Sequence, residues 1–337
     1  MCNENEIHAT GYTDSELELK TSTKDCNSGL GPWVYWPSEL YSVGRLYRKI
    51  AWYPKVLPLY FYGDHGIHST SEFAKHEVDS KSDVHFTFNP ERAIQPVKGK
   101  RKVYLIRHPW VSYRQKKKYE PLATAKGTLI FISHSSSAVE WVEKDRDGYF
   151  SELKELPGKY KPLVLCMHMH DINKKYHLQY RKYNLPIVTC GNTSSIHFVD
   201  EFYKLTTQFK YATSNATGSQ LYYCIEMGMP YFLFGDTPKL LNKSDKNLPL
   251  GIYEHKNNTA KKINEIEQRL FIEKLDEVTL EQKIFAEWVL GFGSNISRYK
   301  FALIVWWQLL INLKKFTRLI AKRIVKKTLL LWRNNSG

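Results

Sequence analysis

The sequence predicts an α/β protein in which two α/β domains face each other across a cleft, followed by a C-terminal amphipathic helical tail. The chain has 337 residues, more than one hydrophobic core usually serves. From residue 127 onward, short apolar segments alternate with amphipathic ones, a pattern typical of a parallel sheet covered by helices. The last tenth of the chain mixes basic and bulky apolar residues, which indicates a separate amphipathic segment.

The composition limits the class of protein. Apolar residues make up 42% of the chain and aromatic residues 14%, which is enough for packed cores and argues against disorder. No charged segment followed by an apolar one opens the sequence, so we expect no cleaved secretion signal. The cysteines form no CxxC pair and no metal-binding spacing, which predicts buried thiols in a reducing compartment: Cys2, Cys26, Cys166, Cys190 and Cys224.

The first third of the chain predicts one domain behind a polar leader. Residues 1–30 are rich in Ser, Thr, Asp and Glu, and we expect them to be frayed or loosely docked. Residues 31–120 then form the acceptor-side α/β domain, with strands at 56–63, 85–90 and 102–109. The charged, weakly periodic stretch 111–127 predicts the junction to the next domain.

The second domain is predicted over residues 121–270. Its expected strands are GTLIFISH (127–134), PLVLCMHMHD (162–171), PIVTCG (186–191), YATS (211–214) and PYFLFG (230–235). Its expected helices lie around YFSELKEL, NKKYHLQYRKY, IHFVDEFYKLTTQ and SQLYYCIEMG. In such sheets, ligands bind where strands end and loops turn into helices.

Three polar loops follow strands of this domain: SHSSS (133–137), GNTSS (191–195) and SNATGS (214–219). One such loop is usually only a helix cap. Three after successive parallel strands predict one polar binding site. Its candidate residues are His134, Ser135, Ser136, Gly191, Ser194, Ser195, Ser214, Asn215, Gly218 and Ser219.

The loop 214–219 is the best candidate for binding a phosphate. A helix N-terminus exposes unpaired backbone N–H groups and the positive end of the helix dipole, and a glycine lets a phosphate approach closely. The electrostatic gain is about 0.3 to 2 kcal/mol, so we expect this loop to position an anion rather than to supply all its affinity.

The same stretch resembles the donor-binding segment of GT-B-type glycosyltransferases and of sugar-nucleotide epimerases that share their fold. The likeness consists of the polar loop, the helix and a G-x-P sequence before the next strand, here Gly228, Met229 and Pro230. It covers roughly residues 127–240, and the N-terminal domain only by architecture. The resemblance implies two Rossmann-like domains, a nucleotide-sugar donor in the second, and transfer that needs neither a metal nor another cofactor.

The donor class is narrowed by one departure from that family. Its UDP-sugar enzymes hold the ribose with a glutamate five residues before the glycine, and here Tyr223 stands there, with Glu226 nearby on another face. The pair His108–Pro109 and the Ser-Ser pairs at 135–137 and 194–195 resemble the HP and SS motifs of bacterial sialyltransferases and Kdo transferases. These motifs favour a CMP-linked donor such as CMP-Kdo.

The candidate base lies in the first domain, in GDHGIH. Asp64 and His65 follow a strand and are bracketed by Gly63 and Gly66, so both would project toward the cleft. Asp64 would deprotonate an acceptor hydroxyl, orient His65 to do so, or act as the nucleophile of a retaining enzyme. The alternative is a tight turn, in which Asp64 and the glycines serve backbone geometry.

The segment HMHD (168–171) suggests a metal site at first, because His168 and His170 would share one face of a strand. No third ligand follows at a suitable spacing, so we expect no metal. A contact from His170 or Asp171 to the donor sugar or base, at the end of the strand, is the preferred interpretation.

The tail, within residues 271–337, predicts a membrane-associating helix. Its apolar run 301–313 is too short to span a bilayer, and an amphipathic stretch follows. Nine Lys or Arg and no acid lie between Lys300 and Arg333, out of a net charge of +15. Such a helix would bind the anionic inner leaflet of a membrane; the alternative is a helix packed across both domains, and unbroken bulky aliphatics argue against nucleic acid.

These features together predict a metal-independent glycosyltransferase in the cytoplasm, peripheral on the cytoplasmic face of the inner membrane. It would move a sugar from a nucleotide-activated donor to a lipid-linked saccharide acceptor in bacterial surface polysaccharide synthesis (lipopolysaccharide O-antigen or capsule). The bacterial setting and the pathway are implied by the resemblance alone. The alternatives are a sugar-nucleotide epimerase of the same fold and a non-catalytic membrane-bound assembly protein.

Overall fold

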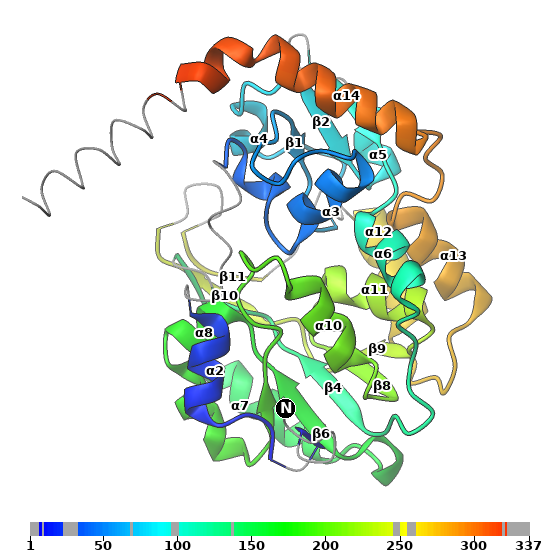
Figure 1. Cartoon of the computed structure of the whole chain (residues 1–337). Helices are drawn as coiled ribbons and strands as arrows, with labels where there is room; N and C mark the ends of the chain where they lie inside the picture. The colour runs from blue at the N-terminus through cyan, green and yellow to red at the C-terminus, as the bar shows by residue number, and fades with distance from the viewer. Residues whose placement is uncertain are drawn as a thin grey trace, which may run out of the picture.

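Two parallel sheets and one small antiparallel sheet form the framework of the computed structural model (Figure 1). The structure describes residues 7–8, 10–22, 33–67, 70–95, 101–135, 138–244, 250–254, 261–318 and 321. The prediction of an α/β fold with parallel sheets is confirmed. Buried apolar side chains of both parallel sheets belong to one connected cluster, and the division into two facing domains stays a prediction.

The first parallel sheet has the order β1-β2-β3, with strands at Tyr62–Gly63, Val84–Thr87 and Lys102–Leu105. The helices of this region are η2 (Trp36–Ser38), α3 (Val43–Ile50), α4 (Lys75–Val78), α5 (Pro90–Ala93) and α6 (Pro109–Lys117). Helix α6 starts where Pro109 fixes the backbone and His108 caps the first turn, and it ends at Lys118 in the left-handed region. The first part of the expected junction 111–127 is therefore helix, as far as Lys117.

The second parallel sheet has the order β7-β6-β4-β8-β9, and its strands are Ile187–Val188, Leu163–Cys166, Thr128–Phe131, Tyr211–Ser214 and Tyr231–Leu233. Its helices are α7 (Glu143–Lys154), η3 (Gly158–Tyr160), α8 (Met169–Asn173), α9 (Tyr176–Tyr180), η4 (Arg181–Tyr183), α10 (Phe198–Thr206) and α11 (Ser219–Met227). The five strands expected from the sequence are all present. Strand β4 lies in the middle of this sheet, between β6 and β8. The three polar loops follow β4, β7 and β8, at the edge where the parallel strands end.

A small antiparallel sheet was not expected from the sequence. Its strands are β5 (Val139–Trp141), β10 (Lys239–Asn242) and β11 (Gly251–Glu254), in the order β11-β10-β5. Val139 and Leu240 reach the cavity described below, so this sheet closes one side of the site.

The N-terminal segment docks on the second sheet, contrary to the expectation of a frayed leader. Helix α2 (Asp14–Thr21) begins with a capping box between Thr13 and Glu16, and its Leu17 is fully buried. Gly11 bridges Ile187 of β7, and Arg181 binds Asp14 at 2.8 Å. Residues 10–22 are thus part of the fold.

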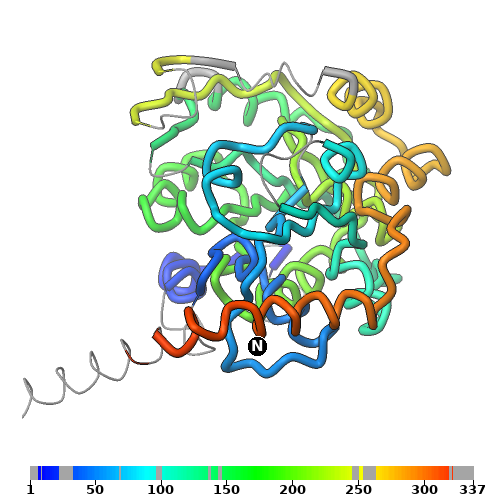
Figure 2. Tube along the Cα trace, turned by 90° about the horizontal axis from the view of Figure 1, so that it is seen from above, coloured from blue at the N-terminus to red at the C-terminus, as the bar shows by residue number. Residues whose placement is uncertain are grey.

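The C-terminal helices run along one side of the molecule. They are α12 (Lys261–Phe271), α13 (Leu280–Val289) and α14 (Arg298–Ile311), and Figure 2 shows them passing from the region of the second sheet back to the first. Phe301 of α14 packs against Tyr47, Phe61 and Phe86. The alternative of a C-terminal helix packed across both domains is met only in part, because α14 packs on the first sheet and α3. The basic stretch from Lys322 to Arg333 lies outside the described residues.

Candidate functional site

A cavity of about 490 Å³ lies where the two parallel sheets approach each other. On one side it is bounded by the loop after β1, with His65, Gly66 and Ile67. On the other side it is bounded by the ends of β4, β6 and β7 and by the start of α11. This is the position at which parallel α/β sheets usually bind ligands.

The start of α11 opens onto this cavity. Gly218 precedes the helix with extended backbone angles and makes no capping hydrogen bond with a side chain. Residues 216–220 line the cavity, so first-turn backbone N–H groups face it. Gly228 ends the helix at φ +89°, where a glycine relieves the strain of the left-handed region. The helix N-terminus predicted from SNATGS is at the site.

The loop 65–67 and helix α11 are in direct contact. The backbone N–H of Ile67 donates to the hydroxyl oxygen of Ser219 at 2.8 Å. A side chain at Gly66 would place its Cβ 2.9 Å from the same oxygen, so a larger residue there would require the Ser219 side chain to shift. The first sheet therefore reaches the N-terminal end of α11 through Gly66 and Ile67.

His65 is the predicted catalytic residue that lines the cavity. Its ring stacks on Tyr41, with centroids 5.9 Å apart and the planes 9° from parallel, and it contacts Trp36 at 5.3 Å. The side chain is partly exposed, so an imidazole nitrogen is accessible to a ligand.

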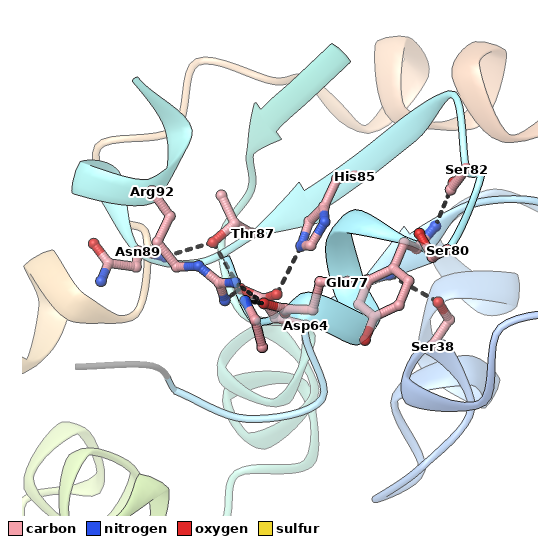
Figure 3. A network of polar contacts seen from close by, with 12 residues as sticks. Ser38, Asp64, Glu77, Ser80, Ser82, His85, Thr87, Asn89 and Arg92 are labelled. Atoms are coloured by element: carbon pink, nitrogen blue, oxygen red, sulfur yellow. Dashed lines mark hydrogen bonds and ion pairs between the residues drawn. The ribbon is translucent and has the colours of Figure 1, made fainter. Parts of the chain in front are cut away.

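Asp64, in contrast, does not line the cavity, and its carboxylate lies in a buried network of polar contacts beside the first sheet (Figure 3). Its carboxylate is 1% exposed and contacts His85 at 2.8 Å, the Thr87 hydroxyl at 2.7 Å and the Arg92 guanidinium at 3.0 Å. A carboxylate held by three donors beneath the surface cannot reach a ligand in the cavity. The expectation of Asp64 as base or nucleophile is therefore wrong on geometry, and its role is structural.

The same network contains the group of described residues whose ligand atoms lie close enough together to hold a metal ion. Asp64, Glu77 and His85 bring one ligand atom each within 4.8 Å of one another. Arg92 lies among them, and its guanidinium binds Glu77 at 2.6 Å as well as Asp64. A buried cation already neutralises both carboxylates, so this cluster is an ion network of the protein itself.

Three histidines gather at the ends of β4 and β6. The rings of His134 and His168 stack with centroids 4.1 Å apart, and His170 lies 4.8 Å from His168. Burial and the neighbouring imidazole of His134 lower the pKa of both His168 and His170. His134 and His168 line the cavity, whereas His170 lies behind them and is exposed. These three imidazoles do not form a group whose nitrogens lie close enough together to hold one metal ion, and His134 and His168 are placed to contact a ligand in the cavity.

Ser135, Ser214 and Asp171 form hydrogen bonds within the loops, and none of the three lines the cavity. The Ser135 amide and hydroxyl both donate to Asp171, which is buried and has a raised pKa because of that burial. The Ser214 hydroxyl donates to the Ala216 carbonyl at 2.6 Å. Asn215 is also buried, and its side-chain oxygen accepts from the Ser133 hydroxyl.

The loop after β7 contributes its glycine. Gly191 lines the cavity, whereas Ser194 and Ser195 are used locally: the Ser194 amide donates to Asn192 at 2.9 Å, and the Ser195 hydroxyl accepts from the His197 amide. Ser136 lies outside the described residues. Of the predicted donor contacts, His134, Gly191, Gly218 and Ser219 line the cavity.

Glu226 is also placed away from the site. Both of its carboxylate oxygens accept from the Arg114 guanidinium, each at 2.8 Å, and the pair is buried between α6 and α11. The expectation that Glu226 binds the donor is therefore wrong, because the carboxylate ties two helices together.

Several cavity residues were not predicted. Tyr41 and Trp110 come from the first region of the chain, and Cys166 and Cys190 place their sulfurs 3.8 Å apart at the ends of β6 and β7. Tyr223, noted only as a departure from a family pattern, lines the cavity as well. His168 and Cys190 are each the second residue beyond a strand end, a position from which the sequence could have predicted them; Tyr41 has no comparable signal.

The described residues that line the cavity include no Asp, Glu, Lys or Arg. Its polar groups are hydroxyls, imidazoles, thiols, amides and the end of α11. An anion bound here would be held by neutral donors and by the helix dipole.

The chain matches no protein-family model, no curated protein and no solved structure.

Proposed function

We propose that the protein is a glycosyltransferase that uses a nucleotide-activated sugar and acts on a lipid-linked saccharide at a membrane surface. The observation that carries the proposal is the cavity at the uncapped start of α11, which faces His65 across the interface between the sheets. Such a site combines a place for a phosphate, a base on the opposite wall and walls that exclude water, and glycosyl transfer requires all three.

The donor phosphate would lie at the first turn of α11. The backbone N–H groups of Ser219 and Gln220 point along the helix axis toward the cavity, and the helix dipole favours the charge that builds up as the phosphate leaves. The nucleoside would lie over the ends of β6 and β7, near Gly191 and His168. A CMP-linked sugar such as CMP-Kdo is the proposed donor class, because Tyr223 stands where the UDP-sugar enzymes carry a glutamate and the pairs His108–Pro109 and Ser194–Ser195 resemble motifs of CMP-sugar transferases.

His65 would take the proton from the acceptor hydroxyl. It is the cavity-lining imidazole that belongs to the loop after β1, opposite α11. Imidazole is the side-chain group that most often serves as a general base, so it is suited to this role. His134, on the donor side of the cavity, would contact the sugar or the phosphate.

A thermal-shift panel tests nucleotide binding. CMP, UDP, GDP and dTDP are added in turn to the purified protein, and a ligand present at 100 times its dissociation constant should stabilise the fold by about 2.7 kcal/mol. We expect CMP to raise the melting temperature most. A shift with UDP alone would contradict the CMP donor, and no shift with any of the four would contradict the proposed function.

Membrane association would depend on the outer face of α14. The inner face packs on the body, whereas Leu303, Trp307 and Leu310 on the outer face are 72%, 61% and 54% exposed. Exposed Lys314, Lys315 and Arg318 follow directly. An apolar stripe beside cations is complementary to an anionic bilayer surface. In the described part of the chain no helix has the length and apolarity needed to cross a bilayer.

The variant Leu303→Ser/Trp307→Ser/Leu310→Ser should bind anionic phosphatidylglycerol vesicles at least about tenfold more weakly than the unmodified protein, because the apolar contact is lost. Co-sedimentation with vesicles measures the change. Leu280→Ser is the matched control: Leu280 is equally exposed, at 73%, but lies on α13. Equal binding by the triple variant and the control would contradict the proposal.

A further inference from the structure

Behind the cavity wall, Tyr223 of α11 is bonded to a histidine that the mechanism above does not use. The Tyr223 hydroxyl and Nε2 of His108 are 2.9 Å apart. Tyr223 is 4% exposed and lines the cavity, whereas His108 is completely buried and does not. The contact joins the start of α6 to the first turns of α11.

The direction of this hydrogen bond follows from the other nitrogen of His108. Nδ1 accepts from the Trp110 amide at 3.2 Å, in the N-cap of α6, so Nδ1 carries no proton. Burial lowers the pKa of His108 to about 3, and the ring is neutral near pH 7. The single ring proton is therefore on Nε2, and His108 donates to the tyrosine oxygen.

Tyr223 consequently has its own proton left to donate. Burial raises the pKa of this phenol well above its ordinary value, so the hydroxyl stays protonated. The Ser219 hydroxyl, one helical turn earlier on α11, accepts from the Ile67 amide at 2.8 Å. Both residues line the cavity, and each hydroxyl keeps a proton that it can donate to a ligand.

We propose that His108, Tyr223 and Ser219 form a directed relay, in which His108 donates to Tyr223 and the Tyr223 and Ser219 hydroxyls donate to an oxyanion of the ligand, the donor phosphate, rather than holding a ribose diol. A ribose hydroxyl has a proton of its own to donate, which a carboxylate at position 223 would accept and a donating tyrosine is less suited to accept. A phosphate oxygen accepts only. The inference rests on the proposed function and assigns the ligand group at this end of the cavity.

The neighbouring groups agree with this assignment. Ser219 and Gln220 also offer their backbone N–H groups at the start of α11. No carboxylate is found among the described cavity residues to repel a phosphate or to accept from a ribose. His108 acts here as a positioning residue, because it fixes the tyrosine proton without touching the ligand.

Isothermal titration calorimetry with CMP, cytidine and inorganic phosphate tests the relay. Tyr223→Phe removes the donor and keeps the ring, and we expect it to weaken CMP and phosphate binding roughly ten- to hundredfold, as for a lost hydrogen bond to a charged group. Cytidine affinity should not change. Tyr203→Phe is the matched control, since the Tyr203 hydroxyl is buried without a hydrogen-bond partner among the described residues and lies outside the cavity.

His108→Asn provides a second, independent variant. Asparagine still caps α6 by accepting from the Trp110 amide, but it is too short to reach Tyr223. We expect the ratio of CMP affinity to cytidine affinity to fall in this variant too. If either variant weakens CMP and cytidine equally, or leaves CMP binding unchanged, the relay is refuted while nucleotide binding stands. If neither CMP nor phosphate binds the unmodified protein, the proposed function fails together with the relay.

Discussion

His65→Ala should lower the rate of sugar transfer by about 10² to 10⁴-fold, the usual contribution of a general base. The imidazole lines the cavity from the loop after β1, and the adjacent carboxylate of Asp64 is committed to Arg92, Thr87 and His85. No carboxylate among the described cavity residues can therefore replace it. A radiolabelled-donor assay with vesicle-bound acceptor lipid measures the rate, and nucleotide affinity should stay within about twofold.

His76→Ala is the control for this variant. His76 is exposed on α4, contacts Trp36 and Tyr62, and does not line the cavity. We expect its activity to match the unmodified protein. Full activity in His65→Ala would contradict the assignment of the base and would support a non-catalytic assembly role.

Arg92→Met should reduce the free energy of unfolding by about 3 to 5 kcal/mol, the cost of breaking a buried ion pair by removing one partner. Arg92 is fully buried and binds two carboxylates, Asp64 at 3.0 Å and Glu77 at 2.6 Å (Figure 3). Without the guanidinium, both acids remain buried with uncompensated charge. Urea unfolding followed by circular dichroism gives the change.

Arg269→Met is the matched control. The pair Arg269–Glu281 has a similar separation of 2.5 Å, but its side chains are 62% and 60% exposed. An exposed pair contributes about 0 to 1 kcal/mol, so this variant should unfold almost like the parent. Equal effects of the two substitutions would show that the Asp64 network does not stabilise the fold as the burial implies.

The parallel sheets were predictable because their strands are short apolar runs bounded by turn signals. All five strands of the second sheet fall within the predicted segments, as at Leu163–Cys166 and Tyr211–Ser214. The antiparallel sheet was not predictable, because β10 and β11 are each only four residues and β5 only three, and their pairing joins distant parts of the chain. The bridge from Gly11 to β7 and the burial of Leu17 are likewise long-range contacts, and the polar composition of residues 1–30 does not predict them.

The sequence predicted which loops form the candidate site, but not which of their side chains face the cavity. The start of α11 and the loop after β1 both reach the cavity as expected. The pairing of the strands decides whether Asp64 or His65 faces the cavity. The Asp64 amide donates to the Phe86 carbonyl and so continues the pairing of β1 with β2. The Asp64 side chain therefore contacts His85 of β2, whereas His65 lines the cavity. Glu226 was misassigned for a similar reason, since its partner Arg114 lies 112 residues away.

A crystal structure with bound CMP tests the central claim most directly. The account predicts a phosphate oxygen about 3 Å from the backbone nitrogen of Ser219 or Gln220, within reach of the Tyr223 hydroxyl, with His65 on the opposite wall. A nucleotide bound at any other surface, or a cavity left empty at saturating CMP, would contradict it.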